Sequence, residues 1–310
     1  MRGSEKMRIR SRIEQVYEQA DVIPISKNGN YVFFSDCHRG VGSWNDNLAA
    51  NQNLVSTALN YYYEAGFTYF ELGDGDELWE NRKPGKIIAA HSDIFWLMRK
   101  FYRDNRLYML YGNHDVKKKK KNFVSKYYAD FWNECTRETE PLFPELQIRE
   151  GLRLKLESGQ ELFLIHGHQG ELWNDYLYRV TRFMVRYLWK PLEKWSLNDP
   201  TRPAANYKTC EHEEQRLCSF AKDKGLIVIA GHTHRPVLQK AQSGSYMNDG
   251  SMVHPRCITA IELTRGRFSL VKWSVCSRKD GTLYVSREVL DGPERLDDSP
   301  SGLANHLEKS

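Results

Sequence analysis

Five short apolar runs, each followed within two residues by Asp, Asn or His, constrain the fold of this chain more than any other feature. The runs are four or five residues long and rich in aromatic and aliphatic side chains, as buried strands are. Between the first three lie residues 48–65 and 87–102, which have the periodicity of amphipathic helices. Strands that alternate with helices predict βαβ units and mainly parallel pairing, hence an α/β fold. The runs are residues 31–34, 68–72, 107–111, 162–165 and 226–230.

Antiparallel pairing is predicted in two places. Residues 152–156 alternate strictly between apolar and polar side chains and meet residues 161–165 across Ser158-Gly159, which favours a hairpin. Three later runs are separated by Gly-containing turns and indicate a closing antiparallel meander. These three runs are residues 257–263, 268–273 and 282–286.

The two ends of the chain differ from its middle. Residues 8–20 are typical of a short polar helix that precedes the domain, and the residues from Asp291 onward are polar, as in a mobile tail. We therefore expect an N-terminal helical extension at 1–27, one α/β domain at 28–290 and a C-terminal tail at 291–310.

Composition narrows the class of protein. With 310 residues, 40% hydrophobic and 27% charged, the chain can bury a substantial core. A formal charge of +5 is too small to indicate a nucleic-acid binder by itself. Six cysteines without CxxC spacing favour a reduced, cytoplasmic environment. No run of 18 apolar residues and no apolar N-terminal segment occur, so we expect neither a transmembrane helix nor a secretory signal.

The residues that follow the strand-like runs are metal-ligand types. Six of the ten histidines lie there, beside Asp and Asn, and this mixture of oxygen and imidazole nitrogen suits Mn²⁺, Fe²⁺ or Zn²⁺. Each motif alone would more often be a turn or a cap. Because ligands bind at the carboxyl ends of strands in such sheets, we expect the motifs to converge on one metal centre. The motifs are Asp36-Cys37-His38, Gly73-Asp74, Gly112-Asn113-His114-Asp115, His166-Gly167-His168 and Gly231-His232-Thr233-His234.

The order and spacing of these motifs resemble those of the calcineurin-like metallophosphoesterases, over roughly residues 31–263. The resemblance implies an α/β/β/α sandwich of two mixed sheets. It also implies two divalent ions, Mn²⁺ first and Fe²⁺ or Zn²⁺ as alternatives, with a shared hydroxide that attacks phosphorus. One ion would be bound by Asp36, His38 and His234, and the other by Asn113, His166 and His232.

The carboxylate between the two ions has three candidates, Asp74, Asp76 and Glu77. We favour Asp74, which directly follows Gly73 at the end of a strand-like run, and Asp76 stays open as an alternative. By the same resemblance, His114 would stay free of metal, near the leaving-group oxygen, as a proton donor or an electrostatic stabiliser.

Three further residues are candidates for supporting roles. Asp115 could hold the ring of His114 through its other nitrogen. Arg39 could hold a substrate phosphate bidentately, or it could be a surface arginine paired with an acid. His168 could rival His166 as a ligand, but we place it in the wall of the substrate pocket or behind the ligands.

About 60 residues separate the fourth motif from the fifth, so we expect a helical cap insertion at 170–224. Its Arg and Lys residues recur at helical spacing, which indicates an anionic ligand or membrane surface, or else a solvated basic face. The lysine run at 117–121 reads as solvated and could steer polyanions, nucleic acid included. The regularly spaced Arg and Lys residues of the predicted cap, which we call the basic stripe, are Arg179, Arg182, Arg186, Lys190 and Lys194.

Within the superfamily, the layout is most similar to the UDP-2,3-diacylglucosamine pyrophosphohydrolases, which carry a cap at this point. The chain departs from them at His114 and His168, where those enzymes commonly have Arg and Asp. The sequence therefore predicts a phosphoesterase or pyrophosphohydrolase that acts on a small or lipid-linked phosphoester, with peripheral contact to anionic membrane. The alternatives are a protein phosphatase or nuclease of the same superfamily, or a non-catalytic binding module on this fold.

Overall fold

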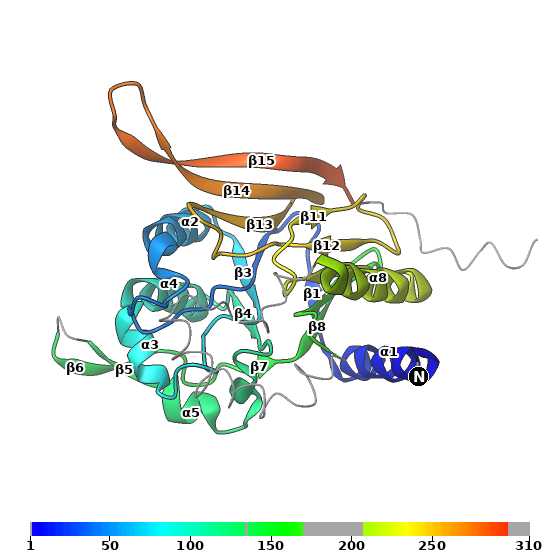
Figure 1. Ribbon diagram of the computed structural model, residues 1–310, viewed down its shortest axis with the longest axis horizontal. Helices are drawn as coiled ribbons and strands as arrows, with labels where there is room; N and C mark the ends of the chain where they lie inside the picture. Colours follow the sequence, from blue (N-terminus) through cyan, green and yellow to red (C-terminus); the bar gives the residue numbers. More distant parts are fainter. Residues whose placement is uncertain (1, 134–135, 170–206, 297–310) are drawn as a thin grey trace, which may run out of the picture.

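The computed structural model describes residues 2–133, 136–169 and 207–296, and Figure 1 shows their arrangement. The helices are α1 (Arg2–Gln19), η1 (Ala49–Asn51), α2 (Gln52–Glu64), α3 (Pro84–Ala90), α4 (Ser92–Arg103), η2 (Val116–Lys119), α5 (Phe123–Tyr127) and α8 (Tyr207–Lys224). The first strands are β1 (Asp21–Ile25), β2 (Asn30–Phe34), β3 (Thr68–Leu72), β4 (Leu107–Leu110), β5 (Asp130–Asn133), β6 (Glu138–Pro141), β7 (Ile148–Arg149) and β8 (Gly151–Leu156). The remaining strands are β9 (Glu161–Ile165), β10 (Ile227–Ala230), β11 (Val237–Leu238), β12 (Tyr246–Asn248), β13 (Cys257–Thr264), β14 (Arg267–Ser277) and β15 (Leu283–Arg295).

Two large mixed sheets form the centre of the molecule. The seven-stranded sheet has the order β15-β14-β13-β2-β3-β4-β7, with β2, β3, β4 and β7 parallel and the β13–β15 meander antiparallel. The six-stranded sheet has the order β1-β8-β9-β10-β12-β11, in which β8 and β9 form the predicted hairpin and β9, β10 and β12 run parallel. Short β5 and β6 form a separate ribbon.

Apolar side chains fill three layers. The inner layer lies between the sheets and contains Phe33 of β2 together with Leu164 of β9. On the other face of β2, Val32 packs toward α2 and α4. The outer face of the six-stranded sheet packs against α1 and α8, through residues such as Val16. In Figure 1, α2 and α4 lie on one side of the sheets and α1 and α8 on the other. The predicted α/β/β/α sandwich is thus confirmed.

Several segments differ from the sequence expectation. The stretch at 87–102 is two helices, because the backbone breaks at His91, whose buried ring bonds to Asp46 (2.8 Å). Helix α1 is longer than predicted and its Ile13 and Val16 are buried in the third layer, so it is part of the sandwich. Strand β15 continues past residue 290, where we expected the domain to end, and Leu296 is buried beyond it.

The predicted cap at 170–224 is described only in part. Residues 170–206, with the basic stripe, lie outside the described residues. Residues 207–224 form α8, which covers the six-stranded sheet with buried Leu217, Phe220 and Ala221. Among the described helices, none combines the length and apolar character needed to cross a membrane.

Candidate metal centre

The five motifs lie in loops at the carboxyl ends of strands from both sheets. The first three follow β2, β3 and β4 of the seven-stranded sheet, and the last two follow β9 and β10 of the six-stranded sheet. Asp36 and His234 belong to one group of neighbouring ligand atoms, and Asp74 and His166 belong to another. Loops that are far apart in the chain therefore meet at one place, as strand-end loops of α/β sheets do.

Unusual backbone conformations concentrate in these loops. Nine described residues other than glycine have positive φ, and five of them are candidate ligands, with φ between 47° and 70°. Positive φ is unfavourable for a residue with a β-carbon and persists only where the surroundings enforce it. The fold therefore holds these side chains in directions that a relaxed loop would not give. The five residues are Asp36, His38, Asp74, His232 and His234.

Backbone hydrogen bonds continue the pairing of β2 with β3 beyond the strand ends. The amide of Asp36 donates to the carbonyl of Gly73 (3.1 Å), and the amide of His38 donates to the carbonyl of Asp74 (2.9 Å). A β-carbon at Gly73 would lie 2.8 Å from the backbone nitrogen of Gly112, so this close approach requires glycine. The first and second motifs are therefore fixed to each other.

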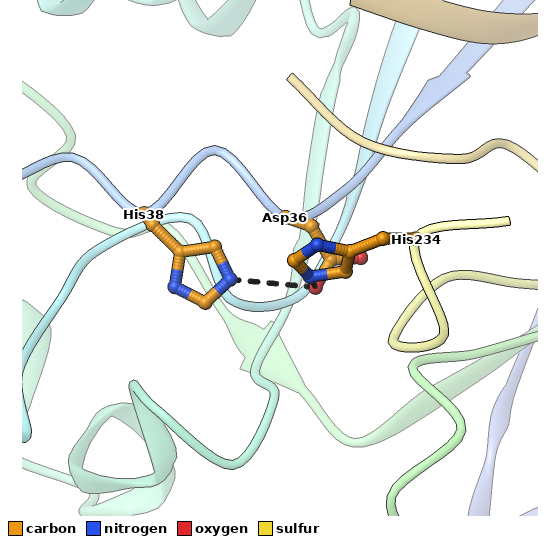
Figure 2. A group of neighbouring side chains, drawn as sticks. All are labelled: Asp36, His38 and His234. Carbon is orange, nitrogen blue, oxygen red and sulfur yellow. Dashed lines mark hydrogen bonds and ion pairs between the residues drawn. The ribbon is translucent and has the colours of Figure 1, made fainter. Parts of the chain in front are cut away.

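Asp36, His38 and His234 form the first ligand group, drawn in Figure 2. His234 Nε2 lies 3.0 Å and His38 Nε2 lies 3.6 Å from the same oxygen, Asp36 Oδ1. Burial alone would raise the pKa of Asp36, but His234 and His166 hold that pKa well below its usual range, so the carboxylate is ionised. The three side chains could hold one cation between them.

Asp74, His166 and His232 form the second group, and all three are buried. His166 Nδ1 lies 2.9 Å from the carbonyl oxygen of Leu72, to which it can only donate, so Nε2 is left for a metal. Asp74 Oδ2 lies 3.2 Å from His166 Nε2 and 3.9 Å from His38 Nε2 of the first group. One carboxylate oxygen thus faces both groups.

Several buried polar atoms here need a partner. Among the described residues, His38 Nε2, His166 Nε2 and both amide atoms of Asn113 have no hydrogen-bond partner. The backbone carbonyl of Asn113 accepts from Trp79 Nε1 (2.6 Å), so its loop is fixed while its side chain stays unsatisfied. Unpaired buried polar groups are costly. Divalent ions held by the imidazole nitrogens, the amide oxygen of Asn113 and the carboxylates would satisfy all of these atoms except the amide nitrogen of Asn113, which is a donor, so the residues present fit such ions.

His114 contacts a carboxylate that sequence reasoning did not assign to it. His114 Nδ1 lies 2.7 Å from Glu77 Oε2, which is also 3.3 Å from His38 Nδ1. The ring of His114 stacks on Trp79, with 4.1 Å between ring centroids. The side chains of His38, Glu77 and His114 could also bind an ion, but direct hydrogen bonding already accounts for their spacing. Glu77 therefore orients both imidazoles.

Asp115 does not hold the ring of His114, and the role predicted for it is wrong. Its Oδ1 accepts from the backbone nitrogen of Gly112 (2.7 Å) and its Oδ2 from that of Gly75 (3.0 Å). The carboxylate points away from the imidazole because it ties two backbone loops together. The ammonium of Lys118 lies 2.7 Å from Asp115 Oδ2.

Arg39 does not fit the role of a substrate ligand. Only 1% of it is exposed, and its guanidinium binds Glu71 bidentately at 2.7 and 2.8 Å. Its Nε donates to Asp76 Oδ1 (2.7 Å), so its donors face inward and away from any substrate. The same contact engages Asp76, which leaves Asp74 as the carboxylate that faces both ligand groups.

His168 is buried beside the second ligand group. Its ring centroid lies 5.5 Å from that of His166 and 6.3 Å from that of His232. Burial, and then the neighbouring His166 and His232, lower the pKa of His168 well below its usual range, so the ring is neutral. At 1% exposure it lies behind the ligands and does not form an open pocket wall.

Sequence reasoning missed four contributors. The sequence offers Glu77 only as a bridging carboxylate, although its place three residues after Asp74 is a usable signal. The sequence predicts five solvated lysines at 117–121, and nothing in the run distinguishes Lys118. Ser35 Oγ lies 2.6 Å from Asp36 Oδ2 and 2.6 Å from Asp249 Oδ1, and only the structure brings Asp249 there.

Residues 29–236, more than half of the chain, match the family model of the calcineurin-like phosphoesterases. The chain therefore belongs to the calcineurin-like phosphoesterase family. No curated protein sequence matches it.

Several solved structures are distantly similar to the chain. Vps29 of Chaetomium thermophilum has 9% identity and a TM-score of 0.40, over 85% of this chain and 96% of that one. A protein described as a 5′-nucleotidase of Staphylococcus aureus, in complex with alpha-ketoglutarate, has 14% identity and a TM-score of 0.34, over 87% and 55%. The sulfate thiohydrolase SoxB of Thermus thermophilus has 12% identity and a TM-score of 0.31, over 87% of this chain and 57% of that one. Such distant matches carry no argument about what this chain does.

Proposed function

We propose that the chain is a dinuclear-metal-dependent hydrolase of phosphoesters or pyrophosphates. The observation that carries this proposal is the placement of Asp74 Oδ2, 3.2 Å from His166 Nε2 and 3.9 Å from His38 Nε2. A carboxylate shared between two ligand groups is how two-metal sites hold their ions a few ångströms apart. Mn²⁺ is the ion we propose, with Fe²⁺ or Zn²⁺ as alternatives, because the ligands mix oxygen and nitrogen.

Each ligand group would hold one ion. When bound, the two ions would supply Lewis acidity toward the phosphoryl oxygens and a lowered pKa for water. The protein contributes the fixed geometry, since the positive-φ loops and the paired backbones of the first two motifs allow little adjustment. The proposed ligands are Asp36, His38 and His234 for one ion, Asn113, His166 and His232 for the other, and Asp74 for both.

His114 is the proposed proton donor to the leaving group. Its Nδ1 is engaged by Glu77 at 2.7 Å, so Nε2 is the nitrogen that can reach a substrate. The stacked Trp79 fixes the plane of the ring, and the carboxylate of Glu77 stabilises the protonated imidazole. The backbone amide of His114 donates to Asp74 Oδ1 (2.8 Å), which holds the donor beside the shared carboxylate.

For the substrate we propose an anionic, amphiphilic phosphoester or pyrophosphate, such as a nucleotide-linked lipid hydrolysed in the cytoplasm at a membrane surface. The support is the position and basic composition of residues 170–206, which lie outside the described part of the chain. The layout shared with the UDP-2,3-diacylglucosamine pyrophosphohydrolases favours the same class. Co-sedimentation with anionic and neutral liposomes tests the membrane contact separately.

A substrate panel with Mn²⁺-reconstituted protein tests the proposed function. The panel holds a nitrophenyl diester, a nucleotide-diphosphate lipid, a phosphopeptide and single-stranded DNA. We expect turnover of the diester that requires Mn²⁺ and is lost in Asp74→Asn, with the diphosphate lipid preferred. Preference for phosphopeptide or DNA would replace the lipid substrate with a protein phosphatase or nuclease activity. Mn²⁺ binding without turnover of any substrate would indicate a binding module.

A further inference from the structure

A cluster of buried charged side chains lies behind the metal-ligand loops. It contains two cations and three carboxylates, each no more than 2% exposed. None of these side chains belongs to the two ligand groups around Asp74. Buried charges of this kind need close partners, because their hydration is lost. We call it the buried ion cluster, and it consists of Arg39, Glu71, Asp76, Asp115 and Lys118.

Lys118 enters this cluster from the lysine run. The short helix η2 turns its ammonium inward, 2.7 Å from Asp115 Oδ2, 3.2 Å from Asp76 Oδ2 and 4.0 Å from Glu71 Oε1. The next three lysines of the run are exposed. Burial alone would lower the pKa of Lys118, but Asp115 and Asp76 raise it above its usual range, so the ammonium stays charged.

The carboxylates that Lys118 contacts hold the metal-ligand loops together. Asp115 accepts from the backbone nitrogens of Gly112 (2.7 Å) and Gly75 (3.0 Å), which lie beside the ligands of the third and second motifs. Asp76 accepts from Arg39, whose own amide donates to the carbonyl of Gly75 (3.0 Å). The ammonium of Lys118 thus lies where the loops of all three motifs are joined.

Removal of this ammonium would leave three carboxylates facing one guanidinium. Asp115 and Asp76 both approach Lys118 within 3.2 Å, so without it their negative charges would repel each other at short range. Arg39 cannot compensate, because its terminal nitrogens are bound to Glu71. The backbone amides of Gly112 and Gly75, which donate to Asp115, would move with it. The distance between Asp74 and Asn113 would then change.

We propose that Lys118 is a positioning residue of the metal centre, whose ammonium holds the second and third ligand loops at the spacing that both ions and His114 require. Its effect on turnover rests on the proposed function, whereas its effect on metal binding does not.

The test compares Lys118→Met with Lys126→Met. Lys126 is a matched control because its ammonium is exposed on the nearby helix α5. Calorimetric titration with Mn²⁺ should show affinity about 10–100-fold weaker in Lys118→Met, the range seen when groups behind metal ligands are removed. On a small soluble diester at saturating Mn²⁺, kcat should fall about tenfold or more while KM changes little. Lys126→Met should match the wild type in all three quantities.

Two further variants separate positioning from folding. Lys118→Met with Asp115→Asn removes the uncompensated charge, so its thermal midpoint should recover toward the wild type while Mn²⁺ affinity and kcat stay low. Lys118→Arg keeps the positive charge and should restore part of the Mn²⁺ affinity and part of kcat. Recovery of affinity and kcat in the double variant, or wild-type values in Lys118→Met, would overturn the proposal. A wild type that binds Mn²⁺ but hydrolyses nothing would refute the proposed function, and the affinity comparison would still decide the role of Lys118.

Discussion

Replacement of Glu77 by Gln tests how the protein orients His114. In the structure, Glu77 Oε2 lies 2.7 Å from His114 Nδ1 and 3.3 Å from His38 Nδ1, while Oε1 accepts from the amide of Trp79 (3.1 Å). Gln keeps the size of the side chain and one carbonyl oxygen. It removes the negative charge and places N–H donors where an acceptor is needed.

The size of the effect follows from the bond that changes. A hydrogen bond to a charged group contributes about 1.5–3 kcal/mol net, and a neutral one about 0.5–1.5 kcal/mol. Glu77→Gln should therefore weaken the hold on protonated His114 by about 1–1.5 kcal/mol. Since 1.36 kcal/mol corresponds to a tenfold change in rate, kcat should fall about tenfold.

Two diesters with different leaving groups form the assay. At saturating Mn²⁺, kcat for an alkyl leaving group should show the full loss, because the alkoxide needs a proton from His114. A nitrophenyl leaving group needs less protonation and should lose less. Glu80→Gln is the matched control, since the Glu80 carboxylate accepts a hydrogen bond from the side chain of Asn45, and it should stay within about twofold of the wild type.

Two outcomes would contradict this reasoning. If Glu77→Gln hydrolysed the alkyl diester as fast as the wild type, Glu77 would not govern proton transfer. If both substrates lost kcat equally, Glu77 would act on the metal ligands through His38. Asp115→Asn offers a comparison, because its carboxylate ties Gly75 to Gly112, and we expect it to lower turnover of both diesters alike.

Three more predictions concern metal content, chemistry and stability. Elemental analysis should find two Mn²⁺ per reconstituted wild-type chain and a loss at both sites in Asp74→Asn; tight binding of a single ion by the wild type would refute the dinuclear centre. His114→Asn should keep both ions yet lose about 10²–10⁴-fold in kcat with an alkyl leaving group, and loss of metal would assign it another role. Asp46→Ala should cost about 2–4 kcal/mol of unfolding free energy in chemical denaturation, because His91 Nε2 and three backbone amides lose their acceptor. Burial alone would raise the pKa of Asp46, but the hydrogen bond with His91 holds that pKa below its ordinary 3.8. The stabilisation by Asp46 is therefore present above pH 3.8 and is lost as the pH falls further. An acid-unfolding midpoint that is unchanged in Asp46→Ala would contradict this prediction.

Much of the architecture could be predicted from local pattern. Residues 31–34 are an apolar run, which predicted a strand, and in β2 Val32 and Phe33 are buried in different layers. The break at His91 could not be predicted, because the 3.6-residue pattern runs through it. At that break the ring of His91 bonds to Asp46, 45 residues earlier in the chain. Periodicity reports which face is buried and is silent about such long-range bonds.

The candidate ligand set could also be predicted, since strand ends of α/β sheets converge and the motif order states which residue types arrive there. The structure brings Asp36, His38 and His234 together, and it brings Asp74, His166 and His232 together. Their assignment as metal ligands stays a prediction until metal is measured.

The residues around the ligands were decided by tertiary structure alone. Glu77 and Asp115 flank the motifs equally well in sequence, yet Glu77 binds His114 while Asp115 binds backbone amides. Arg39 and Lys118 looked exposed, and both are buried against carboxylates that come from β3 and from the loops after β3 and β4. The sequence determined which residue types reach the end of each strand. The direction of each long charged side chain depended on which opposite charge the folded chain placed within a few ångströms, and no local pattern records that.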